Sequence, residues 1–308
     1  MVYSLLSRFQ GALVGAALGE DLKGRAASQL SALPPQSQRL WGKVAVLLMQ
    51  DLMQRGGWYG VRQAGSLYQE ALHQGLLTPE QRLTGFDLAL ITLPLALFFH
   101  EAPAKRLKVC QEFGQVWPCD SLAIAEAWSW TTALTALVLG TSSGALVLTQ
   151  VLTALQTFQP AGWEQLEQPL QLGQDWLRRG VGLHRVWQEL PVKQPLSSDR
   201  AIALALYCAL SVPSDFTLAI GRGAQIQPLN LQLCCLIGAL VGAATGLSGI
   251  PVDWRAPYSQ LVVPSWGLSV PALSQMAGQL LALWAGAAHP LSFETVPAIA
   301  APGIIRPR

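Results

Sequence analysis

The chain contains few charged residues for its length. Lys, Arg, Asp and Glu make up 12% of its 308 residues, whereas a typical soluble domain has about 25%. The net charge is only +2 and no basic run occurs, so we expect no nucleic-acid partner. Hydrophobic residues make up 51%, which excludes a disordered chain and leaves either a helical protein with a large interior or a membrane protein.

Long uninterrupted apolar runs are also scarce. Three windows contain no Asp, Glu, Lys or Arg, namely 127–163, 223–252 and 256–293, and each exceeds the ~20 residues that cross a bilayer. However, Pro, Gln, Asn, Ser and Thr recur within them, and such residues are costly against lipid. We therefore expect buried helices and no membrane span. A membrane-bound protein is the alternative, which recovery without detergent in the soluble fraction would exclude.

The common catalytic and metal-binding motifs are absent from the sequence. Five cysteines form no CxxC pair, and an odd count without framework spacing is typical of reduced, buried thiols in the cytoplasm. Four scattered histidines show no HExxH or HxH spacing, so no zinc site is expected. The apolar N-terminal stretch lacks a basic segment before it, which favours an ordinary helix over a signal peptide. We expect a cytoplasmic protein.

Helical periodicity is what the chain does have. Apolar residues recur at helical spacing or continuously in nine segments, namely 3–19, 43–54, 65–75, 85–99, 121–139, 143–157, 200–211, 229–246 and 270–286. Helix starts are indicated at Thr78-Pro79-Glu80-Gln81, Ser198-Asp199 and Pro213-Ser214-Asp215. No segment alternates convincingly as a strand does. We predict an all-α fold with one compact helical domain over residues 1–288 and a Pro-rich C-terminal tail over 289–308.

One heptapeptide occurs twice. GALVGAA stands at residues 11–17 and again at 238–244. Each copy contains two glycines four residues apart, and small residues at that spacing allow helix backbones to approach closely. The repeat predicts tight helix packing and carries no chemistry of its own.

The same two segments resemble the ADP-ribosylglycohydrolase family. Residues 8–22 are similar to the GALLGxAxGDALG helix with which that family opens, with Glu20 where the family has Asp. Residues 237–251, followed by Trp254, are similar to AGALAGAYYGxxxIP, and residues 85–94 are weakly similar to GNGAAMRxAP. The resemblance extends from residue 5 to residue 286 and implies the family's single domain of orthogonally packed helices.

The resemblance also implies two divalent metal ions, which the family holds mainly with the carboxylates of a TDDT-like and a GGDxDT motif. At those positions this chain has Leu40 and Trp41, and Leu229 and Leu231. Whatever the alignment, no Asp or Glu occurs within residues 22–50 or 216–252. Hard cations need oxygen ligands, preferably charged ones. We therefore expect no metal and no cofactor.

In the second window, Gln227, Asn230 and Gln232 could offer neutral carbonyl oxygens. In the middle segment the family's polar positions fall on Phe86 and Ile91. Neutral carbonyls would have to hold a divalent ion largely unaided, which does not replace a carboxylate pair.

We therefore expect a catalytically inactive pseudoenzyme of this family that acts by binding a protein partner or a nucleotide-like ligand. The candidate binding site is the former metal cleft, formed by Arg39, Leu40, Trp41, Lys43, Gln227, Leu229, Asn230 and Leu231. Phosphate binding is one possibility, since five cations lie in the same regions, namely Lys23, Arg25, Arg39, Lys43 and Arg222. The other is that Trp41 fills the cleft and an apolar surface elsewhere receives a partner.

The alternative is a hydrolase of ADP-ribosyl or related N- or O-glycosidic bonds with relocated, metal-independent catalysis. Glu20 and Asp21 are the acids near the expected cleft, and such a pair can act as general acid or base. Arg39 would assist them. At a helix end, however, two adjacent acidic residues are more often simply exposed to solvent and have no catalytic role.

Overall fold

The computed structural model describes residues 3–20, 40–189, 198–226 and 230–286. In these ranges the regular elements are all helices: α1 (Leu5–Glu20), α3 (Trp41–Arg55), α4 (Val61–His73), α5 (Gly85–Phe98), α6 (Pro103–Gly114), α7 (Ser121–Val138), α8 (Gly144–Phe158), α9 (Glu164–Arg179), α10 (Leu183–Glu189), α11 (Ser198–Leu210), α12 (Phe216–Ala224), α13 (Asn230–Thr245), α14 (Val252–Arg255) and α15 (Val270–Trp284), with short 3-10 turns η1 (Leu247–Gly249) and η2 (Ala256–Tyr258). The same ranges hold no strand and two isolated bridges, which confirms the all-α prediction.

All nine helices predicted from periodicity are present, with ends that differ by a few residues at most. The helix start predicted at Thr78 is wrong, because Thr78–Gln81 closes a turn in which the Gln81 N–H donates to the Thr78 carbonyl at 3.1 Å. The helix begins at Gly85 instead. There the Thr84 hydroxyl and the Asp87 carboxylate form a capping box, in which each side chain accepts a backbone N–H of the other residue.

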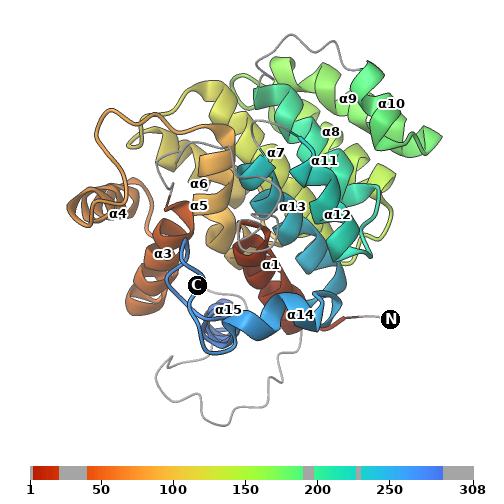
Figure 1. The fold of residues 1–308 in the computed structure, drawn as a ribbon. Helices are drawn as coiled ribbons and strands as arrows, with labels where there is room; N and C mark the ends of the chain where they lie inside the picture. Colours follow the sequence, from red (N-terminus) through yellow and green to blue (C-terminus); the bar gives the residue numbers. More distant parts are fainter. Residues whose placement is uncertain (1–2, 21–39, 190–197, 227–229, 287–308) are drawn as a thin grey trace.

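The apolar helices lie inside the molecule and the amphipathic ones outside. Every residue of α5 is buried, as are nearly all of α7 and the last ten of α11. A helix that is apolar on all sides must be surrounded by others. Helix α4 projects at one edge of the molecule and α9 and α10 cover another, while α1 runs through the middle (Figure 1). Among the described helices, none has both the length and the apolar composition that crossing a bilayer requires.

The repeated heptapeptide forms the contact between α1 and α13. Gly11 faces Gly242 and Gly15 faces Gly238, so the two copies run antiparallel against each other. A Cβ atom added at any of these four glycines would overlap a carbonyl oxygen of the opposite helix. Tight packing as the reason for the repeat is therefore confirmed, and it joins the two ends of the chain at the centre of the fold.

All five cysteines are free, and four of them are buried. Burial raises the pKa of the Cys110 and Cys208 thiols to about 12. A thiol reacts as the thiolate. These two side chains are therefore inert packing groups.

Candidate functional site

The positions at which the family's metal ligands were expected fall on helix starts. Leu40 precedes α3 and Trp41 begins it, and Leu231 lies in the first turn of α13. The middle segment of the resemblance begins at Gly85, the first residue of α5. Helices α3 and α5 pack against each other, as do α5 and α13. The fold therefore brings two of the three predicted segments beside the third.

The described side chains at these positions are mostly apolar and largely buried. Trp41 is 3% exposed, and Leu40 and Lys43 are half-buried. On the next helix, Phe86 and Ile91 are buried. Buried in this way, Trp41 leaves no surface for a ligand at its own position, and that it fills the former metal cleft stays a prediction.

A second tryptophan closes the same helix start. Trp266 is 1% exposed and lies directly against Gly42, so that a Cβ atom at Gly42 would overlap its indole ring. Neither the Trp41 nor the Trp266 indole N–H has a hydrogen-bond partner among the described residues. An indole N–H is a donor and cannot ligate a cation.

The family's divalent metal ions therefore do not fit the side chains at these positions. Leu, Trp, Phe and Ile have no oxygen ligand to offer. Across the described ranges, no group of three or more His, Cys, Asp or Glu side chains lies close enough to hold a metal ion. No step through a metal can be derived for this chain.

Several predicted site residues lie outside the described ranges, namely Asp21, Lys23, Arg25, Arg39, Gln227 and Leu229. The side chains of Glu20, Asn230, Leu231 and Gln232 belong to helix ends at which only the backbone is described. Of the predicted cationic cluster, two members can be placed. Lys43 lies beside Gly267, and Arg222 donates to the Ser211 hydroxyl. These two cations lie on α3 and α12, which are not among the described helices that pack extensively against each other.

A buried carboxyl group beside α5 was not predicted as a site residue. Glu126 of α7 is fully buried, and its side chain lies directly against Gly85, the first residue of α5. Burial raises the pKa of this carboxyl to about 7, and the nearby Asp199 and Asp120 charges add to the shift. The Ser198 hydroxyl and the Gly85 N–H approach and oppose the shift, but no described residue makes a hydrogen bond of good geometry to either carboxyl oxygen.

The sequence carried a signal for Glu126. It is the only charged residue of α7, whose other positions are apolar, Ser or Thr. A single acidic residue in such a helix is either exposed to solvent or buried with a shifted pKa. The sequence alone does not distinguish the two.

Comparison with known proteins agrees with the resemblance. A sequence model of the ADP-ribosylglycohydrolase family matches residues 26–290. No curated protein matches the chain. A solved structure titled "ADP-ribosylglycohydrolase-related protein complex" matches with a TM-score of 0.63 and 17% identity, covering 92% of this chain and 99% of that one. At this identity, the likeness shows the shared fold.

Proposed function

Because the chain belongs to the ADP-ribosylglycohydrolase family, we propose that it is a pseudoenzyme of that family, which works by binding a protein partner or a nucleotide-like ligand. One observation carries the proposal. Where the family's metal-binding carboxylates belong, this chain has Leu40 and Trp41 before and at the start of α3, and Leu229 and Leu231 around the start of α13.

The loss extends beyond single positions. A family enzyme uses its metals to orient the substrate and to activate water. Here the segments 22–50 and 216–252 contain no carboxylate at all, so no shift of register supplies one. The burial of Trp41 supports the further view that an apolar side chain now occupies the vacated space.

Apolar surface near α14 supports the protein-partner version. Val252, Leu261 and Val262 are each more than half exposed. All three lie within one short stretch of the chain, which makes that stretch a candidate contact with another protein. The free cysteines agree with a cytoplasmic location, which stays an expectation.

The test of the proposal combines metal binding with turnover. Thermal unfolding is followed with and without millimolar Mg²⁺ or Mn²⁺, and release of ADP-ribose from ADP-ribosyl-arginine is followed by chromatography. A ligand at 100 times its Kd adds about 2.7 kcal/mol to the free energy of unfolding, so a real site would shift the melting temperature visibly. We expect no shift and no release, with an active family member run in parallel as the positive control. Robust metal-dependent release of ADP-ribose would overturn the proposal.

The second candidate is a metal-independent hydrolase. Glu126 favours it, because a carboxyl with a pKa of about 7 beside the start of α5 suits general acid–base catalysis. Under this alternative, Glu126→Gln or Glu20→Gln abolishes an activity that the unaltered chain shows on ADP-ribosylated or nucleotide substrates. An unaltered chain that is inactive on the whole panel removes the alternative.

A further inference from the structure

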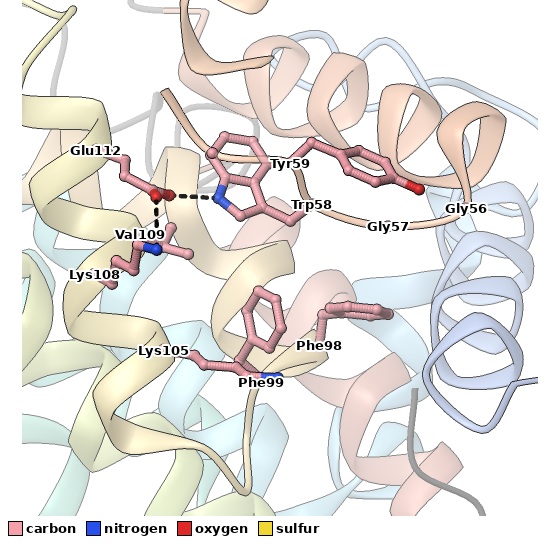
Figure 2. A pocket seen from close by; sticks show the side chains of 11 residues that line it. Gly56, Gly57, Trp58, Tyr59, Phe98, Phe99, Lys105, Lys108, Val109 and Glu112 are labelled. Carbon is pink, nitrogen blue, oxygen red and sulfur yellow. Dashed lines mark hydrogen bonds and ion pairs between the residues drawn. The ribbon is translucent and has the colours of Figure 1, made fainter. Parts of the chain in front are cut away.

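A cavity of about 290 Å³ lies at the other ends of α3 and α5 (Figure 2). The segment Gly56–Gly60 forms one side of it, the end of α5 another, and α6 a third. Helices α3 and α5 have 15 and 14 residues, and a helix rises 1.5 Å per residue, so about 20 Å separates the cavity from the helix starts at which the family's metals belong.

The Gly56–Gly60 wall is held in one conformation. The buried side chain of Gln63 accepts the Tyr59 N–H at 2.7 Å, donates to the Gly57 carbonyl at 3.3 Å and donates to the Asp51 carboxylate. Gly56 and Gly60 have φ angles of 75° and 85°, which only glycine adopts readily. A wall that is fixed in advance loses little entropy when a ligand enters.

Aromatic rings line opposite sides of the cavity. Figure 2 shows Trp58 and Tyr59 on one side and Phe98 and Phe99 on the other. One face of the Trp58 indole stacks on Phe113, with ring centroids 5.4 Å apart and planes 9° apart, and its Nε1 donates to a carboxylate oxygen of Glu112 at 2.7 Å. The indole is therefore immobilised, and a planar ring can stack where it faces the cavity.

The charges around the cavity favour an anion. Lys105 and Lys108 both line it, against the single carboxylate of Glu112. That carboxylate already accepts the Trp58 N–H and lies 3.8 Å from the Lys108 ammonium. A rim of aromatic rings can also bind cations, but here the Lys105 ammonium already lies 5.6 Å from the Phe99 ring centre. A second cation would meet repulsion, whereas an anionic group would meet two exposed ammonium groups.

We propose that this cavity binds a small planar aromatic ring that carries an anionic group, with the ring between Trp58 and Phe99 and the anion at Lys105 and Lys108. Nucleoside monophosphates and aromatic carboxylates share this chemistry. The site lies at the far ends of α3 and α5 from the metal positions, so it stands or falls independently of the lost metal mechanism.

Isothermal titration calorimetry of the full chain tests the ligand class, using AMP, adenosine, indole-3-acetate and inorganic phosphate as probes. We expect AMP to bind, adenosine to bind about tenfold more weakly because it lacks the charge, and phosphate alone not to bind measurably. Tighter binding of indole-3-acetate than of AMP would assign the site to aromatic carboxylates within the same class. If neither AMP nor indole-3-acetate binds at millimolar concentration, or if adenosine binds as well as AMP, the proposal is wrong.

Variants locate the binding. Lys105→Gln and Phe99→Leu should each weaken AMP binding by about tenfold, and added salt should reduce the effect of Lys105. Arg62→Gln is the matched control, since Arg62 is an exposed cation on α4 outside the cavity. Lys105 is itself exposed, so its replacement leaves the fold intact even if the Phe99 variant unfolds. Unchanged AMP affinity in the Lys105 variant would refute the assignment.

Discussion

At the scale of single residues, the glycines between α1 and α13 have the least room for change. Gly15 lies against the Gly238 carbonyl, where no Cβ atom fits. We expect Gly15→Ala to lower the free energy of unfolding by about 2–4 kcal/mol, because the two helices must separate. Thermal or urea unfolding measures this loss.

The control for this substitution is Gly221→Ala. Gly221 lies within α12 and has nothing within 4 Å of an added Cβ atom. Alanine in a helix is there expected to be neutral or to stabilise by about 0.5–1 kcal/mol. If both substitutions lower the free energy of unfolding equally, the loss does not come from the contact between α1 and α13.

Glu126 makes stability depend on pH. Its pKa is about 7 in the fold, against 4.5 ordinarily. Below pH 4.5 the carboxyl is protonated in both the folded and the unfolded state, so it does not lower the free energy of unfolding. Between these values the unfolded chain ionises first, so stability falls as pH rises, and above pH 7 the loss is constant. At about 1.4 kcal/mol per pKa unit, the full loss is about 3 kcal/mol.

Glu126→Gln should remove this dependence. The stability difference between variant and unaltered chain should shift by about 3 kcal/mol in favour of the variant between pH 4 and pH 8. Urea unfolding at several pH values measures it, and Glu80→Gln, in an exposed turn, serves as control. A difference that does not change with pH would contradict a raised pKa.

At the scale of elements, α1 also holds the end of α7. The Arg8 guanidinium donates to the Leu137 carbonyl at 2.6 Å and to the Val138 carbonyl at 3.2 Å. Both belong to the last turn of α7, where no further turn of the helix supplies N–H donors, although the Leu137 carbonyl also accepts the Gly140 N–H at 3.0 Å. We expect Arg8→Met to cost about 1–3 kcal/mol, since partly buried acceptors lose a charged donor. Arg62→Met on the exposed face of α4 should cost less than about 0.5 kcal/mol, and calorimetric melting compares the two.

The sequence predicted those helices whose apolar residues are dense. Among the described helices it missed the short α10 and α14 and also α6 and α9, which are rich in polar residues. In α9 the buried positions Leu166, Leu170, Gly173 and Trp176 do follow helical spacing, but glutamines and Pro169 separate them. Their burial depends on packing against α8 and α11, and such partners are not visible in a local window.

The candidate site was predictable in its chemistry and less so in its geometry. The missing carboxylates and the place of Trp41 follow from the order of residues. The closure by Trp266 over Gly42 joins positions more than 200 residues apart, and the meeting of Glu126 with Gly85 joins two helices. Only the packed fold brings such distant pairs together.

At the scale of the whole molecule, the family match and the folded domain begin at different residues. The match begins at residue 26, yet α1 precedes it and lies in the middle of the helices (Figure 1). Its side chains Phe9, Leu13, Val14 and Leu18 are fully buried. Burying a large apolar side chain contributes about 1.5–3 kcal/mol, so these four contribute about 6–12 kcal/mol, as much as the whole stability of a typical domain, about 5–15 kcal/mol.

A chain that begins at residue 26 should therefore fail to fold, although it contains the entire family match. Without α1, the glycine face of α13 and the contact surfaces of α15 and α7 would be open to water, and apolar surface of that kind leads to aggregation. Circular dichroism and calorimetry of the purified chain should show no cooperative melting. A chain without the predicted Pro-rich tail, residues 289–308, is the matched control and should melt as the full chain does, because that segment shows no helical periodicity. If the shortened chain melts cooperatively at the temperature of the full chain, α1 is an addition to the domain. If cooperative melting is lost, α1 is part of the core.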